Sequence, residues 1–489
     1  NSLQALADLN LQIEEANRTN SNLYTIFFDL QEAFPRVWRH YICTKLHEIG
    51  LRGNLPNLLQ SFLHDRSLTV RIQNIFSSHK LIQNGVPQGE VWSVPLFLIA
   101  INDLSKCVTF PLSQRLFADD FSISLSSTNP NRAIRLLQLT LDKISSWSSE
   151  RGFRFSSHKT VMVVFQKRSS RPLALPPLFL QNFQINLQPH VKFLGITFDS
   201  KTSWTPHLKI LRAKCLQSLN TLKYLSHPRT GCNRKLLLQL YNSLIRSRLD
   251  YGSPIFSHTY KTPLKLLDSI QSSALRIATG ALRTSPTLSL CAETGEPPLR
   301  YRFLSITANF LASTAQFPTL PIFSTALNHQ NSLLHRLESH LHKHLKLNPL
   351  LPLFPSTPPW LTSPPDIRLD LTDLPKSSNS TYREFIKNII SSDYPTHLLC
   401  FTDGSKSGPK TGYAFSIQGI VSNHRIRNSA SIFTAELLAI FSCLSQLTLL
   451  SPPSKFLILS DSLSSLLAIQ HPYSSNPIIQ RIHVLLHSL

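Results

Sequence analysis

The chain has 489 residues and a formal net charge of +22, from 49 Lys and Arg residues against 27 Asp and Glu residues. This length suits about three domains, and an apolar fraction of 42% excludes a chain that is disordered throughout. Seven scattered cysteines without a CxxC pair exclude a disulfide framework and a zinc knuckle, and no apolar run reaches the length of a membrane span.

Four blocks are predicted along the chain. Residues 1–200 alternate short strands with helices, and residues 201–345 are helical and basic. Residues 346–394 are rich in proline and predict an extended linker, after which residues 395–489 return to strands and helices. The only methionine is Met162, so we expect a fragment or a processed product. Free thiols and the lack of a signal peptide indicate an intracellular protein with no visible targeting signal.

The first strand is predicted at Leu23–Phe28 and ends at Asp29. A helix is expected to follow, because apolar residues recur near helical spacing from Phe34 to Ile49. Asp29 is placed to reach a metal ion from the strand end. With Glu32 it also fits a helix capping box, which is a structural alternative.

A glycine-containing turn and an acidic hairpin come next. Gly85–Gly89 is predicted as a rigid turn whose glycines let the backbone approach a ligand closely. Phe117–Asp120 lies between two predicted strands, the second of which, Phe121–Leu125, alternates apolar residues with serines and is expected to be half-buried. Adjacent carboxylates raise each other's pKa unless a cation lies between them. The pair at residues 119 and 120 therefore predicts a metal site, with an ordinary Asp-rich turn as the alternative.

Helices dominate the next part of the chain. Asn131–Ser149 and Lys235–Leu249 are predicted as helices from their apolar spacing. From residue 201 to residue 250, ten cations stand against a single acid, Asp250. This segment is expected to bind a polyanion such as nucleic acid, with a solvated helix face as the alternative. The cations chosen as candidate contacts are Lys209, Arg212, Lys214, Arg234 and Lys235.

Three further carboxylates follow the linker. A predicted strand, Leu398–Thr402, ends at Asp403, and Glu436 lies in the first turns of a helix predicted over Ser431–Leu450. Asp461 ends a third strand and precedes another helix. Strand ends and helix starts bring sequence-distant acids together. The structural alternatives are a turn residue for Asp403, an N-cap for Asp461 and a dipole-favoured charge for Glu436.

Five motifs follow one another in the first part of the chain, and they are Phe27–Phe34, Gly85–Phe97, Phe117–Asp120, Ser157–Thr160 and Phe193–Ile196. In this order, and over residues 10–310, the sequence resembles the reverse transcriptases of non-LTR (LINE-type) retrotransposons, most of all the jockey and I-element groups. Two further segments, Leu249–Gly252 and Arg276–Ala281, look like the family's basic thumb and the region after it. The five motifs look like those of the family's palm.

This resemblance implies a right-hand polymerase palm followed by a helical thumb, in an α+β and α/β multidomain chain. Its acids, Asp29, Asp119 and Asp120, would hold two Mg²⁺ ions, with Mn²⁺ as another possible metal. Phe34 would exclude a ribose 2′-hydroxyl. Lys159 would assist the leaving pyrophosphate, with a surface lysine near a strand as the alternative. Gln88 and Gly89 would face the incoming deoxynucleoside triphosphate and the template. The implied partners are an RNA template, a DNA primer and deoxynucleoside triphosphates, in the nucleus at the integration step and with no membrane.

The last block resembles a ribonuclease H domain, a mixed sheet with helices, through Phe401–Ser405, Thr434–Leu437 and Ser460–Ser462. The resemblance implies that its three acids, Asp403, Glu436 and Asp461, bind two Mg²⁺ ions and cut the RNA strand of an RNA–DNA hybrid. The family's closing segment, with a histidine and a fourth acid, is expected beyond residue 489, so this domain is expected to be truncated.

Four positions depart from the polymerase family, and the fingers segment that precedes its first motif is expected to be missing. The family usually carries Asp at Pro35, Ser at Glu90, Pro at Val94 and Leu at Pro95. Glu90 adds negative charge beside the expected nucleic-acid path. Two other hypotheses therefore stay open, which are an inactive fragment that still binds nucleic acid and a hydrolase that uses only the second set of acids.

Overall fold

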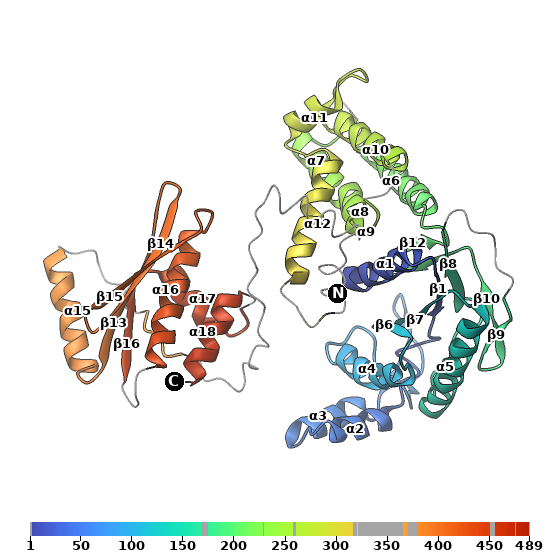
Figure 1. Ribbon diagram of the computed structural model, residues 1–489, viewed down its shortest axis with the longest axis horizontal. Coiled ribbons are helices and arrows are strands. Elements are labelled where there is room, and N and C mark those ends of the chain that lie inside the picture. The colour runs from blue at the N-terminus through green and yellow to red at the C-terminus, as the bar shows by residue number, and fades with distance from the viewer. Residues whose placement is uncertain are drawn as a thin grey trace. The chain divides into compact units, whose positions relative to one another are not determined.

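The computed structural model describes residues 2–167, 175–227, 229–257, 261–315, 320, 365–369, 379–449, 455–474 and 476–488. The chain forms two compact units, residues 1–348 and residues 349–489 (Figure 1). Most of the predicted linker, residues 346–394, lies outside the described residues. Its last part forms a helix, α15 (Asn379–Asp393), which the proline content did not predict.

A six-stranded sheet is the centre of the first unit, with strand order β6-β7-β1-β8-β10-β9. Helix α1 (Ser2–Arg18) packs on one face of this sheet and α5 (Pro130–Arg151) on the other (Figure 1). The strand predicted before Asp29, the hairpin around Asp119 and Asp120, and the helix predicted over Asn131–Ser149 are confirmed. The strands are β1 (Asn22–Phe28), β6 (Ser113–Phe117), β7 (Asp120–Ser127), β8 (Val161–Phe165), β9 (Leu178–Leu180) and β10 (Phe183–Leu187).

The expectation that β7 is half-buried was wrong, because both of its faces are buried. Ser122 and Ser124 are 0% and 1% exposed. They lie under α1 beside Arg115 of β6, whose guanidinium donates a hydrogen bond of 2.8 Å to the Ser124 hydroxyl. Arg115 is itself buried, and its Nε lies 2.7 Å from Oδ2 of Asp8 on α1. A polar strand face is therefore covered by a helix that supplies an ion-pair partner.

The helix predicted directly after Asp29 was also wrong, and with it the capping box. Helix α2 begins only at Arg39 (Arg39–Glu48), after a series of turns in which Glu32 has a φ of 48°. Leu30 forms a β-bridge with Phe155, which holds these turns against a distant loop. Pro35 therefore lies in a turn rather than early in a helix.

Short strands and helices connect α2 to β6 in the sequence. A projecting hairpin is made of β2 (Ser67–Leu68), β3 (Arg71–Ile72), β4 (Ile75–Phe76) and β5 (Lys80–Leu81). Three helices flank it in sequence, and they are α3 (Asn54–Leu63), α4 (Ser93–Ile101) and the 3₁₀ helix η1 (Asn102–Cys107).

A two-stranded ribbon of β11 (His190–Phe193) and β12 (Ile196–Asp199) follows the sheet in sequence. From residue 201 on, the predicted helical character is confirmed for the described residues. The helix predicted over Lys235–Leu249 is α7, a π-helical turn η2 and α8 in one continuous run. The helices are α6 (Thr205–Leu225), α7 (Arg234–Tyr241), η2 (Asn242–Arg246), α8 (Ser247–Asp250), α9 (Ser253–Phe256), α10 (Lys261–Thr279), α11 (Thr287–Thr294) and α12 (Leu299–Ala315).

His207 on α6 is expected to make the stability of this unit depend on pH. Its ring is 6% exposed, and Nδ1 accepts a hydrogen bond from the Thr197 backbone N–H. Burial, assisted by the charge of Lys214, lowers the pKa of His207 from 6.5 to about 4. Below pH 6.5 the His207 imidazole binds a proton in the unfolded chain but not in the folded chain, so the folded state loses stability as pH falls. We expect a loss of about 2 kcal/mol in the free energy of unfolding between pH 7 and pH 5.

Urea unfolding at pH 5, 6 and 7 measures this loss. His207→Asn keeps an acceptor for Thr197 and should remove this part of the pH dependence, whereas the exposed His79→Gln should leave it unchanged. If the free energy of unfolding changed with pH equally in the wild-type chain and in His207→Asn, the assignment of this pH dependence to His207 would be wrong.

The second unit is a four-stranded sheet in the order β15-β14-β13-β16, in which β13 and β16 are parallel. Leu398 and Cys400 of β13 pack against α16, whereas Leu399 and Phe401 lie against α15. The predicted elements are confirmed, although β13 is longer than expected. They are β13 (Leu398–Ser407), β14 (Lys410–Ile417), β15 (Ile420–Ile426), α16 (Ile432–Leu447), β16 (Phe456–Ser460), α17 (Leu463–Gln470) and α18 (Pro477–Ser488).

All seven cysteines are free, as predicted. None of the helices among the described residues combines the length and the apolar character needed to cross a bilayer.

Candidate functional site

Three acids of the first unit meet at one edge of the six-stranded sheet. Strands β1 and β7 are antiparallel with Phe28 opposite Phe121, so Asp29 leaves β1 at the end where Asp120 begins β7. Asp119 occupies the turn between β6 and β7, and Ala118 before it has a φ of 51°. The hairpin therefore brings the adjacent acids to the strand end that carries Asp29.

The charges at this edge favour a bound cation. Burial raises the pKa of Asp120, and the charges of Asp119 and Asp29 raise it further, while Lys192 opposes them. The Lys159 ammonium lies 3.5 Å from Oδ2 of Asp29 and is 72% exposed. A divalent cation with oxygen ligands would relieve the repulsion among these carboxylates.

Two turns frame this acidic edge. Gly85 has a φ of 86°, and a Cβ there would lie 2.6 Å from the Pro35 carbonyl oxygen, so only glycine fits against the turn that follows Asp29. Phe34 of that turn is partly buried and stacks on Phe97 of α4, with ring centroids 4.6 Å apart. Gln88 and Gly89, the predicted substrate contacts in the Gly85–Gly89 turn, are exposed, and so is Glu90.

Arg39 is a further residue of the site, and sequence reasoning missed it. Its Nε donates to the Gly85 carbonyl at 2.8 Å and its NH1 to the Ile82 carbonyl at 2.9 Å. The Gly85 N–H in turn donates to the Val37 carbonyl at 2.8 Å. Arg39 thus holds the two turns together. A single arginine at the start of a helix carries no local pattern that would have indicated this.

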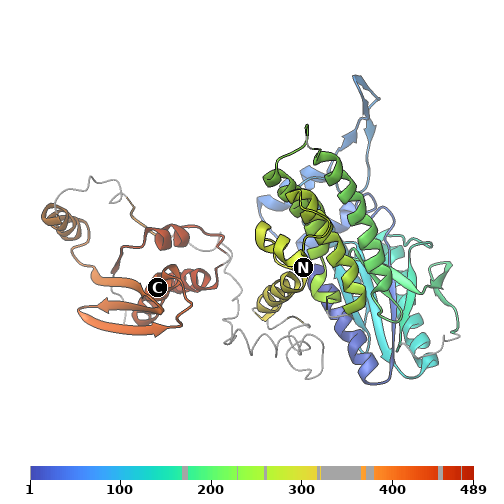
Figure 2. The same cartoon turned by 90° about the horizontal axis from the view of Figure 1, so that it is seen from above.

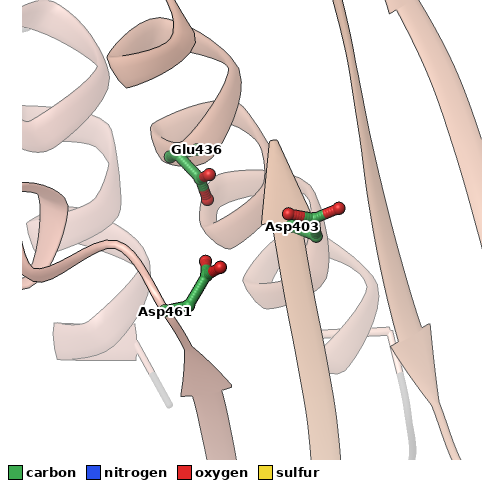
Figure 3. Close-up of side chains that lie close together, drawn as sticks. All are labelled: Asp403, Glu436 and Asp461. Carbon is green, nitrogen blue, oxygen red and sulfur yellow. The ribbon is translucent and has the colours of Figure 1, made fainter. Parts of the chain in front are cut away.

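A second set of acids is more tightly gathered, in the second unit. Asp403 of β13, Glu436 of α16 and Asp461 after β16 point toward one another (Figure 3). Their ligand atoms all lie within 4.8 Å of one another, and among the described residues no other trio of His, Cys, Asp or Glu is gathered so closely. The prediction that Asp403 ends its strand was wrong, because β13 continues to Ser407 by pairing with β14.

Glu436 of this second set has a raised pKa. Burial raises its pKa to about 6, and Asp461 and Asp403 contribute, while a hydrogen bond from the Gly404 backbone opposes the rise. Its Oε2 is buried and has no hydrogen-bond partner. A buried acceptor without a partner beside two more carboxylates fits a hard divalent cation such as Mg²⁺ or Mn²⁺.

The basic residues predicted to contact nucleic acid differ in whether their charge is already paired within the chain. Lys209, Arg212 and Lys214 are exposed along α6, and Lys235 is exposed on α7. Arg234, however, pairs with Glu293 at 2.8 Å, so part of its charge is already compensated.

Residues 2–198 match the family model described as "Reverse transcriptase (RNA-dependent DNA polymerase)". Over 260 residues the chain is 26% identical to "Probable RNA-directed DNA polymerase from transposon BS" of Drosophila melanogaster, which covers 52% of this chain and 28% of that protein. Over 263 residues it is 26% identical to "RNA-directed DNA polymerase from mobile element jockey" of the same organism, with the same coverage. The aligned region thus spans little more than a quarter of the relatives' length.

These matches confirm the resemblance of the first unit to reverse transcriptases of non-LTR retrotransposons. Among solved structures, "Structure of apo telomerase from Candida Tropicalis" aligns over 68% of this chain and 56% of that one at 13% identity, with a TM-score of 0.33. That likeness adds no argument about the fold.

Proposed function

We propose that the first unit is an RNA-directed DNA polymerase domain that copies an RNA template from a DNA primer. In this proposal residues 1–200 form the palm, with the six-stranded sheet at its centre, and residues 201–345 form the thumb. The observation that carries it is the meeting of Asp29, Asp119 and Asp120 at one sheet edge, inside the segment that matches the reverse transcriptase family.

The three acids would hold two Mg²⁺ ions. When bound, these ions lower the pKa of the primer 3′-hydroxyl and neutralise the triphosphate with its leaving pyrophosphate. The chain's own contribution is to hold the carboxylates, since the β6–β7 hairpin presents Asp119 and Asp120 beside the end of β1.

Other residues would orient the substrates. Phe34, fixed by its stack on Phe97, would lie under the sugar of the incoming nucleotide and exclude a ribose 2′-hydroxyl. Gln88 and Gly89 would face the nucleotide and the template. Lys159, which pairs with Asp29 here, is mostly exposed and long enough to turn toward the pyrophosphate. The exposed cations of α6 would contact the phosphates of the primer–template duplex.

Primer extension on an RNA template tests this proposal. We expect Asp119→Asn to lower Mg²⁺-dependent synthesis by roughly a hundredfold or more, because one metal-binding charge is lost. Asp142→Asn, on the exposed face of α5, is the matched control and should synthesise at the wild-type rate. Undiminished synthesis by Asp119→Asn would rule out the assignment. Filter binding of nucleic acid without any wild-type extension would favour the inactive fragment.

We also propose that the second unit, over residues 395–489, is a ribonuclease H-like domain that cuts the RNA strand of an RNA–DNA hybrid. The observation that favours it is the close grouping of Asp403, Glu436 and Asp461 around the unpartnered Oε2. Metal ions bound there would activate a water molecule for attack on the RNA phosphate. Gly404 would hold the Glu436 carboxylate through its backbone N–H.

Cleavage of a hybrid labelled on its RNA strand tests the nuclease. We expect Asp403→Asn to lower Mg²⁺- or Mn²⁺-dependent cleavage by roughly a hundredfold or more, because the metal site loses a charge that faces the other two acids. Cleavage that survives in Asp403→Asn would point to a contaminating nuclease and against the proposal.

A further inference from the structure

The projecting hairpin of the first unit, residues 67–81, is here called the arm. Figure 2 shows it extending away from the rest of the unit. Every one of its residues is exposed, on both faces of the ribbon. Backbone hydrogen bonds close it, from the Ile82 N–H to the Arg66 carbonyl at 2.8 Å and from the Ser77 N–H to the Val70 carbonyl at 2.9 Å. A two-stranded hairpin of this kind is marginally stable alone, so a partner would stabilise it.

The arm exposes large apolar side chains that the core of the unit does not use. Ile72, Ile75 and Phe76, next to its tip, are 70%, 77% and 61% exposed. A group of exposed apolar side chains on a protruding element is a candidate interaction surface.

The charge of the arm indicates what its partner is. No Asp or Glu occurs between Asp65 and Glu90, whereas Arg66, Arg71 and Lys80 lie in or next to the hairpin. Arg71 and Phe76 are directly opposite each other on β3 and β4, and the guanidinium carbon lies 5.4 Å from the ring centroid. An arginine over an aromatic ring, with further cations nearby, suits a partner with both negative charge and flat apolar faces.

The root of the arm is fixed to the turns that follow Asp29, since the Gly85 N–H donates to the Val37 carbonyl and the Val86 N–H to the Phe34 carbonyl. Arg39 donates to the carbonyls of Ile82 and Gly85, so the strand that leaves the arm is fixed to the Gly85–Gly89 turn. A strand bound along the arm would therefore lead directly to that turn.

We propose that the arm binds an unpaired RNA strand, the part of the template that has not yet reached the polymerase site. One base stacks on the ring of Phe76 and its neighbours contact Ile72 and Ile75, while Arg71 and Lys80 contact phosphates. That this strand is the template rests on the proposed polymerase function, whereas the binding itself does not.

Fluorescence anisotropy of a short unstructured RNA, with the full chain and without nucleotides, tests the proposal. We expect Phe76→Ala to weaken binding by about tenfold through lost stacking, and Phe76→Trp to retain it. Arg71→Gln should weaken binding and reduce the slope of log affinity against log salt by about 0.7, whereas Phe76→Ala should leave that slope unchanged. Phe179→Ala replaces a phenylalanine that is 49% exposed on β9 and is the matched control, with wild-type affinity expected.

Several results would overturn the proposal. These are wild-type RNA affinity in Phe76→Ala, an equal loss in Phe179→Ala, and RNA displaced from the chain by phosphatidylserine vesicles, which would identify the arm as a lipid-binding element. Because the assay needs no catalysis, its outcome is separate from that of the primer-extension test. Active polymerase with unchanged RNA binding in Phe76→Ala would reject the arm alone, and weakened binding with Asp119-independent synthesis would reject the polymerase assignment alone.

Discussion

Replacing Gly404 with alanine is expected to lower the cleavage of an RNA–DNA hybrid by roughly a hundredfold, although all three acids stay in the chain. A Cβ at this position would lie 2.6 Å from the Glu436 backbone nitrogen and 2.9 Å from its carboxyl carbon. Since the first of these atoms is backbone, β13 and α16 must move apart. A displacement of about 1 Å costs roughly a hundredfold in rate, because the acids no longer converge.

Hybrid cleavage and metal titration measured on the same samples check this expectation. Gly404→Ala should also lower the free energy of unfolding of the second unit by about 1–3 kcal/mol through overpacking. Ser405→Ala alters the next, exposed residue of the same strand and should match wild type in both measurements. Wild-type cleavage and metal affinity in Gly404→Ala would show that the close approach of β13 to α16 is not required.

Asp8→Asn is expected to destabilise the first unit by about 3–5 kcal/mol, because it leaves the Arg115 guanidinium buried and uncompensated. The Arg115 side chain is 3% exposed and that of Asp8 is 16% exposed. Burial lowers the pKa of Arg115, and Asp8 opposes that effect. The Nε of Arg115 makes a charge contact with Asp8 rather than a well-aligned hydrogen bond, so charge compensation is the main part of the interaction.

Urea unfolding of single and double variants separates the contributions. Arg115→Met removes the buried charge itself and should cost less, about 1–3 kcal/mol. The double variant should be more stable than the sum of the two losses predicts. Arg18→Met breaks a pair with Glu15 on the same helix, with side chains 55% and 34% exposed, and should cost less than about 1 kcal/mol. Additive losses in the double variant would show that Asp8 and Arg115 act independently.

Local periodicity predicted the elements that carry the acids, because alternation and helical spacing are local properties of the sequence. It could not predict what lies opposite them. Ser122 and Ser124 have the sequence of a solvated face and are buried only because Arg115 and Asp8 complete a polar layer under α1. Asp8, the residue that decides this burial, lies more than a hundred residues before Ser124 in the sequence.

The boundaries that were wrong have the same kind of cause. Asp403 precedes a glycine and two serines, which indicate a turn, yet pairing with β14 keeps β13 extended to Ser407. After Asp29 the apolar residues have helical spacing from Phe34 onward, but the helix itself begins only at Arg39. The bridge of Leu30 to Phe155 fixes the residues before it in turns. In both places a tertiary hydrogen-bonding partner outweighs the local preference.

The π-helical turn over Asn242–Arg246 has a consequence for how the chain tolerates changes in length. Leu237, Tyr241, Ile245 and Leu249 follow one another at intervals of four and are all buried, although an ordinary helix would rotate them progressively out of the core. The wider turn absorbs this rotation, as an inserted residue in an otherwise regular helix would. Removing one residue between Tyr241 and Leu249 would place these two seven positions apart, still on one side of a regular helix. This helical run can therefore lose a residue there and keep both of its ends in register with the core.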